Sequence, residues 1–242
     1  MKPRVVCWFS CGAASAYASY LAKQEHGEVE IVYCKVAEEH SDSMRFLKDF
    51  EKLIGQRVTV IGDNAMGYSI YDVFTNRKFI KGAQGAPCTM VLKKWQRQKF
   101  QRPDDIQVFG YTSEEDKRID RFIDGNAEVD ARFPLAEKGI SKKDCLQWLV
   151  DSGLTLPLMY QLGYQNNNCV GCVKGGMGYW NAIRKDFPQA FDRMAKLERQ
   201  LNHAVNKDEK GPIFLDELDP GRGNFKRDQP PACGFTCELE KD

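Results

Sequence analysis

The chain has 242 residues, enough to bury a sizeable core in one domain with or without an appended segment. Its 35 basic and 34 acidic residues leave a formal net charge of +1, which excludes the overall positive field that draws proteins to nucleic acids or anionic membranes. No apolar run approaches the roughly 18 residues that span a bilayer, and the amino terminus lacks a signal-peptide pattern. We therefore expect a cytoplasmic protein without a membrane partner.

The first part of the chain alternates between the periodicities of strands and helices. The expected elements are a strand over residues 4–9, a helix over 13–23, a strand over 30–36, a helix over 43–53 and a strand over 57–61. Because these strands are rich in apolar residues on both faces, they predict a parallel sheet that helices cover on both sides.

The rest of the chain follows this pattern less regularly. Aromatic residues and glycines interrupt it over residues 64–87. The later expected elements are a helix over 89–100, a strand over 106–111, a helix over 141–153, a helix over 179–202 and an irregular tail from residue 206. For the helix over 141–153, Ser141 and Asp144 resemble a capping box and Gly153 is a typical end.

These elements predict an α/β fold with a doubly wound, Rossmann-like parallel sheet and a cysteine-containing carboxy-terminal extension. The nucleotide-binding domain is expected over residues 1–160. Residues 161–242 would add a cysteine-motif loop, a helix and a tail packed on the same domain.

Nine cysteines are an odd number and a high one for a reducing compartment, where clustered thiols indicate metal or redox chemistry more often than disulfides. Cys7, Cys34 and Cys145 lie in apolar or amphipathic stretches and are expected in the core. The other six lie beside glycines, prolines or polar residues and are the candidates for chemistry: Cys11, Cys88, Cys169, Cys172, Cys233 and Cys237.

The loop between the first strand and the first helix consists of small residues: Ser10, Cys11, Gly12, Ala13, Ala14 and Ser15. In a doubly wound sheet this position brings a helix amino terminus to the carboxyl edge, where free backbone N–H groups bind phosphate. Small side chains let phosphate oxygens approach, and the two serines add hydroxyl donors. A tight turn that merely packs closely is the alternative, and the residues alone leave both open.

Basic residues follow at two further places, Lys93 and Lys94 on a helix and Arg118 and Arg121 after the fourth strand. Arginine suits bidentate phosphate or sulfate binding, and lysine supplies a point charge. Each could instead be a solvated surface charge. Together with the first loop, Lys93 and Arg118 are the stronger candidates for phosphate ligands.

Cys169 and Cys172 form a C-x2-C pair, whose spacing lets one turn direct two thiolates at one ion. Joined by Cys233 and Cys237, they would form a tetrahedral zinc site. Joined by Cys88, they would hold a [4Fe–4S] cluster with one open iron. Free thiols in a loop are the third possibility.

Five segments, in order, resemble the phosphoadenosine-phosphosulfate (PAPS) reductase-like branch of the PP-loop, or adenine nucleotide alpha hydrolase, superfamily. SCGAAS resembles the Ser-Gly-Gly-x-Asp-Ser pyrophosphate loop, with Cys11 in place of a glycine and Ala14 in place of the aspartate. The other four segments are APCTMVLKKW, GYTSEEDKRIDR, FPLAEKGISKKDCLQWL and LGYQNNNCVGCVKGG. The last is similar to a motif of phage and mobile-element members.

The resemblance implies a PP-loop (HUP-type) fold that binds ATP or a related adenine nucleotide. The residues implied in binding are Ser10, Cys11, Gly12, Ala13, Ala14, Ser15, Lys93, Glu115 and Arg118. The tail PPACGFTCE is also similar to the Glu-Cys-Gly-x-His segment of sulfonucleotide reductases, with Ala232 and Thr236 where those enzymes have Glu and His. Cys88, Lys93 and Cys233 are thus the implied catalytic residues, and Cys88, Cys169, Cys172 and Cys237 the implied metal ligands.

The implied activity is ATP-dependent activation and sulfur transfer to a nucleic-acid base or nucleotide. The implied acceptor is tRNA or DNA, and a sulfur donor or thiol reductant would take part. The implied cofactor is an iron–sulfur cluster, with zinc as the alternative. A homodimer is compatible with this activity. PAPS reduction by Cys233 is the alternative that suits Ala14, because it needs no ATP cleavage. The second alternative is a zinc-stabilised nucleotide- or nucleic-acid-binding module without catalytic activity.

Overall fold

The computed structural model describes residues 2–62, 67–82 and 85–235. The chain divides into two compact units, and we describe each by itself. The first consists of Met1–Lys35, Ser41–Gly62 and Trp95–Leu162, and the second of Val36–His40, Asp63–Lys94 and Gly163–Asp242. Within the described ranges, no helix has both the length and the apolar character that crossing a membrane requires.

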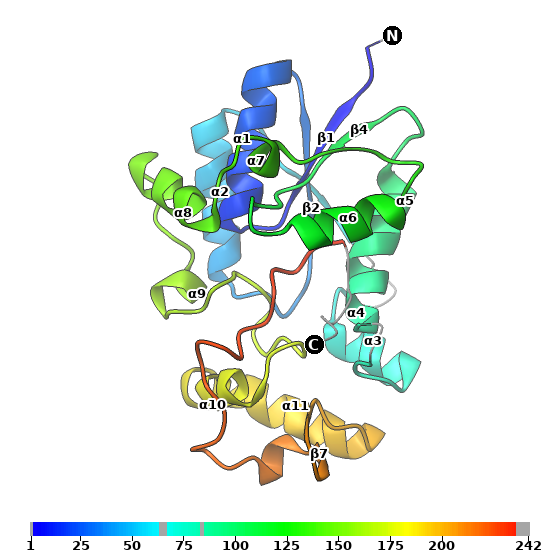
Figure 1. Ribbon diagram of the computed structural model, residues 1–242, viewed down its shortest axis with the longest axis vertical. Coiled ribbons are helices and arrows are strands. Elements are labelled where there is room, and N and C mark those ends of the chain that lie inside the picture. The colour runs from blue at the N-terminus through cyan, green and yellow to red at the C-terminus, as the bar shows by residue number, and fades with distance from the viewer. Residues whose placement is uncertain (1, 63–66, 83–84, 236–242) are drawn as a thin grey trace. The chain divides into compact units, whose positions relative to one another are not determined.

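A parallel five-stranded sheet forms the centre of the first unit (Figure 1). Its strands are β1 (Val5–Phe9), β2 (Glu30–Cys34), β3 (Thr59–Ile61), β4 (Ile106–Val108) and β5 (Asp130–Arg132). They lie in the order β3-β2-β1-β4-β5, and every neighbouring pair is parallel. This confirms the expected α/β fold with a Rossmann-like, all-parallel sheet.

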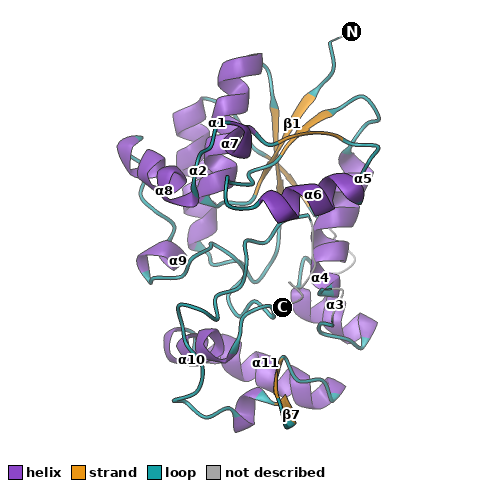
Figure 2. Cartoon of the chain, viewed as in Figure 1, coloured by secondary structure: helices purple, strands orange, loops and turns teal. Residues whose placement is uncertain are grey.

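Helices cover both faces of this sheet (Figure 2). The helices of the first unit are α1 (Ala13–His26), α2 (Asp42–Ile54), α5 (Trp95–Phe100), α6 (Asp116–Asp124), α7 (Pro134–Glu137), α8 (Lys142–Asp151) and α9 (Leu158–Gln161). On one face, Cys7 and Phe9 of β1 join a buried cluster with residues of α1 and α2. On the other face, Trp8 contacts Phe100 of α5 edge to face, with ring centroids 5.9 Å apart. Alternate residues of β1 are thus buried on opposite faces, as a doubly wound sheet requires.

The sequence predicts the elements of the first unit unevenly. The β-α-β-α-β order of the first 62 residues is present, and α8 has the expected capping box between Ser141 and Asp144. Cys7, Cys34 and Cys145 are buried, as expected. The pattern does not predict α6 or β5.

The second unit is mainly helical. Its elements are α3 (Ile70–Arg77), α4 (Pro87–Thr89), the π-helical turn η2 (Met90–Lys94), α10 (Met177–Asp186), α11 (Pro188–Leu201), β6 (Asn206–Asp208), β7 (Gly211–Ile213) and the 3-10 turn η3 (Leu215–Glu217).

Several of these elements correct the expectations. The single helix expected over residues 179–202 is two helices, because Phe187 leaves the helical conformation and Pro188 starts α11. The interrupted stretch over 64–87 contains α3 within its described part. The helix expected from residue 89 begins at Pro87, and the tail expected to be irregular contains the antiparallel pair of β6 and β7.

Candidate functional site

Two loops at the carboxyl edge of the sheet flank the point where its winding reverses. From β1 the chain continues to β2 on one side, whereas β4 pairs with the other side of β1. In open α/β sheets, ligands bind at this switch point, outside the carboxyl ends of the strands. The loop over residues 10–12 follows β1, and residues 109–115 follow β4. Both loops belong to the first unit.

The Ser15 hydroxyl organises the loop after β1. Its oxygen accepts hydrogen bonds from the Ser10 amide and the Ser10 hydroxyl, both at 3.0 Å, and it donates to the Gly12 carbonyl oxygen at 3.0 Å. Ser15 is buried, while Ser10 is half-buried. The two hydroxyls expected to contact phosphate therefore bind the loop itself and hold its backbone in place.

Cys11 has a backbone conformation that favours glycine. Its φ is 54°, and its side chain is fully buried in the core of the first unit. A left-handed conformation costs an ordinary L-residue roughly 1–2 kcal/mol. The position where the PP-loop motif has a glycine thus has a glycine-like backbone in this chain, although the residue is cysteine.

The amino terminus of α1 opens toward the same loop. Gly12 is its N-cap residue, with an extended backbone and no side chain of its own to cap the helix. The first-turn amides of a helix have no intrahelical acceptor, and the helix dipole adds partial positive charge there. One of these amides, that of Ala13, donates to the Tyr160 hydroxyl at 3.2 Å. The geometry suits an anion such as phosphate.

Gly110 brings the loop after β4 against this helix start. A Cβ atom at Gly110 would lie 2.7 Å from the Cα and backbone N of Ser15 and 2.8 Å from the carbonyl carbon of Ala14. Real Cβ atoms do not approach backbone so closely, so only glycine fits. The loop after β4 therefore touches the backbone of the first turn of α1.

Glu115 and Arg118, the two site residues predicted in this segment, form an ion pair. Glu115 also accepts hydrogen bonds from the amide and the hydroxyl of Thr112, at 3.0 and 3.2 Å. The Arg118 guanidinium stacks over the Tyr111 ring, 4.7 Å from its centroid. The pair thus fixes one cation beside the carboxyl end of β4.

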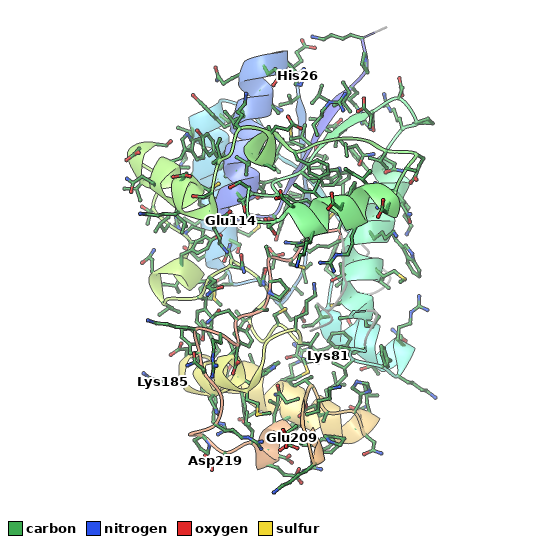
Figure 3. The ribbon with its side chains drawn as sticks, in the orientation of Figure 1. His26, Lys81, Glu114, Lys185, Glu209 and Asp219 are labelled. Carbon is green, nitrogen blue, oxygen red and sulfur yellow. The ribbon has the colours of Figure 1, made fainter. Side chains whose placement is uncertain are left out.

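Lys142, the first residue of α8, adds a second cation to this group. Its backbone amide donates to both carboxylate oxygens of Glu114, each at 3.2 Å, and Glu114 precedes α6 (Figure 3). Burial lowers the pKa of Lys142, and Arg118 lowers it further, while Glu115 and Glu114 oppose this. The charges of Arg118, Lys142, Glu114 and Glu115 therefore interact beside the loop that follows β4.

The second unit contains the cysteine motif. Its C-x2-C turn pairs with the segment before α2: Glu39 and Cys169 form an antiparallel bridge, and the Val170 amide donates to the Glu38 carbonyl at 2.8 Å. At the other end of the turn, the Cys172 amide donates to the Tyr179 hydroxyl at 2.8 Å. Both cysteines are buried.

A buried ion pair lies beside this turn. The Lys93 ammonium is 3.2 Å from Glu39 Oε1, and the two side chains are only 7% and 4% exposed. Burial raises the pKa of the Cys169 thiol well above its ordinary value, and the nearby Glu39 carboxylate adds to this, while Lys93 opposes it. Lys93, predicted as a phosphate ligand, thus has a carboxylate partner in its own unit.

The segment over residues 226–233 is docked on residues 165–168, which we call the asparagine loop. Asn166 donates to the Pro230 carbonyl and Asn168 to the Pro231 carbonyl, both at 2.9 Å. The Cys233 amide in turn donates to Asn168 Oδ1 at 2.9 Å. Cys233 is partly exposed, and these bonds hold it near Cys169.

Lys81 is a further group with altered chemistry in the second unit (Figure 3). Burial lowers the pKa of its ammonium to about 8, although Cys172 and Glu198 attract the charge. Its backbone carbonyl is 2.8 Å from Nε2 of His203. The second unit thus contains an amine with a pKa of about 8 whose charge interacts with Cys172 of the motif.

The predicted metal ligands do not make up a metal site within the described residues. Over residues 2–62, 67–82 and 85–235, no three His, Cys, Asp or Glu side chains form a group that could hold a metal ion. Cys88 is half-buried at the start of α4, and Cys169 and Cys172 lie at their turn. Cys237 lies outside the described residues. Cys88, Cys169 and Cys172 therefore do not form a ligand group within the described residues, and the [4Fe–4S] cluster stays a prediction.

No family model matches the sequence, and no curated protein matches it. The resemblance to PP-loop proteins thus rests on the sequence motifs, and the geometry above rests on the chain itself.

Sequence reasoning missed three residues of these sites. Glu39 gave no signal, because its partner Lys93 lies 54 positions away. Nothing in the local sequence singles out Lys142, because its contact with Glu114 spans 28 positions. Tyr160 lies 147 positions from the amide it binds. Only tertiary structure brings these partners together.

Proposed function

We propose that the protein is an adenine-nucleotide-binding enzyme of the PP-loop type, in the PAPS reductase-like branch. The phosphates would bind at the loop over Ser10, Gly12 and Ser15, where backbone amides and the dipole of α1 favour anions. Arg118 of α6 and Lys142 of α8 would contribute positive charge beside the loop after β4. The proposed reaction begins with adenylation of a base or nucleotide by ATP, which releases pyrophosphate. A persulfide that a sulfane-sulfur donor forms on a thiol of the second unit would then displace AMP, and the thiol reductant would cleave the resulting disulfide to release the thiolated product and regenerate the thiol.

One observation carries the nucleotide part of this proposal. The loop of small residues follows β1 at the topological switch point, and the first turn of α1 after it lies directly against the backbone of Gly110 in the loop after β4. This is the place where doubly wound folds bind ligands. The glycine-like backbone of Cys11 agrees with the resemblance to the pyrophosphate loop.

The sulfur-transfer part rests on the resemblance and on the thiols near Cys169. Cys233 is held near Cys169 by the asparagine loop, and Cys169 is buried beside the pair of Lys93 and Glu39. Thiol exchange needs an accessible thiol close to a second sulfur, and Cys233, which is partly exposed and near Cys169, meets that condition.

The reaction is tested by product analysis. Purified protein is incubated separately with ATP and with PAPS, with a thiol reductant and candidate RNA and DNA acceptors. The proposal predicts pyrophosphate release from ATP that depends on an acceptor. Release of adenosine bisphosphate from PAPS would instead support sulfonucleotide reduction, and binding without either product would support a catalytically inactive module.

The metal prediction has its own test, the Cys88→Ala variant purified without oxygen. If Cys88, Cys169 and Cys172 hold a [4Fe–4S] cluster, the variant loses iron and visible absorbance relative to the parent protein. Retained zinc would favour a site made by the other cysteines. Full retention of the metal in the variant removes Cys88 from the ligand set.

A further inference from the structure

One hydrogen bond at the amino terminus of α1 comes from outside its loop. The Ala13 amide donates to the Tyr160 hydroxyl at 3.2 Å, and a Cβ atom at Gly12 would lie 3.2 Å from the same oxygen. An anion bound to this helix start would place an acceptor oxygen on the same first-turn amides. The phenolic oxygen of Tyr160 therefore stands where a phosphate oxygen would accept the Ala13 proton.

Contacts with α2 hold the segment that carries Tyr160. Asp42 accepts a hydrogen bond from the Leu158 amide at 2.8 Å, and Arg45 donates to the Leu156 carbonyl at 3.2 Å. Asp42 and Arg45 are themselves joined by a bond of 2.6 Å between Oδ1 and Nε. The position of the Tyr160 hydroxyl thus depends on these contacts with α2 as well as on its hydrogen bond with the Ala13 amide of α1.

We propose that Tyr160 gates the phosphate site: its hydroxyl caps α1 in the empty protein and leaves the Ala13 amide when the phosphates of a nucleotide bind. This inference rests on the proposed nucleotide site. The amide has one proton, so the phenolic oxygen and a phosphate oxygen compete for it. A phosphate oxygen wins, because hydrogen bonds to charged acceptors are roughly twice as strong as those to neutral ones.

The gate has a consequence for ligand choice. An uncharged ligand gains too little from the Ala13 amide to displace the hydroxyl, and a highly charged phosphate chain gains most. Nucleoside di- and triphosphates and inorganic pyrophosphate are therefore the class of ligand that opens the site, and nucleosides are not.

Removal of the hydroxyl tests the competition. Titration of Tyr160→Phe with ATP and with inorganic pyrophosphate should give dissociation constants roughly threefold to tenfold below those of the parent protein, because no hydroxyl has to be displaced. Tyr17→Phe is the matched control, since Tyr17 is also in the first unit and its ring stacks on Trp148, with centroids 4.5 Å apart. Its affinity should equal that of the parent.

The amide resonance of Ala13 gives a second readout. It should differ between the parent and Tyr160→Phe in the free proteins and coincide in the complexes saturated with pyrophosphate. If Tyr160→Phe binds with the affinity of the parent, the gate is overturned. If the variant binds more weakly and its Ala13 resonance still differs from that of the parent in the saturated complexes, the gate is also overturned, and the hydroxyl is instead a phosphate ligand. If the parent binds neither ATP nor pyrophosphate, the proposed nucleotide site fails and the gate fails with it.

Discussion

Gly110 lies in the loop after β4 and Ser15 in the first turn of α1, and their backbones are in contact. The Cβ atom of an alanine at position 110 would overlap backbone atoms of Ser15 and Ala14 at 2.7–2.8 Å. Such an overlap cannot be relieved by a side-chain rotation, because the atoms belong to the start of α1. Relief requires β4 or α1 to shift.

Gly110→Ala should therefore destabilise the protein by roughly 2 kcal/mol or more and weaken nucleotide binding. Urea denaturation and calorimetric titration measure the two effects. Gly125→Ala is the control, because its φ is −88° and its nearest contact would be at 3.2 Å. A Gly110 variant as stable as the Gly125 variant would contradict the close contact.

For single residues, the sequence indicates which residues lie at a site more reliably than it indicates which groups their side chains bind. The small residues over 10–15 predict a backbone site after the first strand. Residues 10–12 do lie between β1 and α1, whereas residues 13–15 form the first turn of α1. The hydroxyls of Ser10 and Ser15, however, bind the loop itself, and Lys93 binds Glu39. Neither could be predicted, since a hydrogen-bonding side chain takes whichever partner the tertiary fold brings near.

Among the elements, the asparagine loop controls where Cys233 lies. Asn168 contributes both a donor, to the Pro231 carbonyl, and an acceptor, for the Cys233 amide. Removal of the Asn168 side chain would break both hydrogen bonds to the segment that carries Cys233. The chain around Cys233 should then open more often.

Asn168→Ala should raise the alkylation rate of Cys233 several-fold, and Asn168→Asp should raise it less, because aspartate keeps the acceptor for the Cys233 amide. Mass spectrometry after timed exposure to iodoacetamide measures the rate at this residue. Equal rates in the parent and both variants would show that the asparagine does not hold the segment.

Elements with strong local signals are predictable, and those without such signals are not. The capping box of α8 and the apolar strands β1 and β2 can be read from the residues. By contrast, β5 has only three residues, two of them exposed, and α6 buries only Phe122. Their place comes from pairing and packing with the rest of the unit rather than from periodicity.

At the scale of the whole molecule, stability should depend on one buried carboxylate. Glu198 of α11 is fully buried and accepts hydrogen bonds from the amides of Val205 and Leu215. Burial raises its pKa to about 7, and the two amides oppose this only in part. Unfolding returns the carboxyl group to water and to its ordinary pKa of about 4.5.

The free energy of unfolding should therefore fall by roughly 1–3 kcal/mol as the pH rises from about 4.5 to about 7, since the folded state binds the proton more tightly in this range. Urea denaturation across this range measures the loss. Glu198→Gln should remove this pH dependence, though it lowers stability throughout by losing one acceptor. Glu209→Gln, at an exposed position of the second unit, should leave it unchanged. An unaltered pH profile in Glu198→Gln would show that another group titrates.

The order of strands across the sheet could not be read from the sequence. Alternation of strands and helices predicts parallel pairing, but it does not say that β4 returns to the far side of β1. The interruption of the first unit by two segments of the second is equally invisible in local patterns. Both depend on long-range contacts, and the switch point that defines the candidate site depends on them too.

Calorimetric titration of the parent protein, Gly12→Asp and Gly12→Asn with ATP and a PAPS analogue tests the nucleotide site most directly. Asp and Asn are both favourable N-cap residues, and both place the same Cβ atom 3.2 Å from the Tyr160 hydroxyl, so the two variants are matched in their effect on folding. We predict that the parent binds at least one of the two ligands and that Gly12→Asp lowers this affinity at least about tenfold through charge repulsion, with a smaller loss in Gly12→Asn. Equal affinities in the parent and Gly12→Asp, or no binding by the parent, would contradict the account.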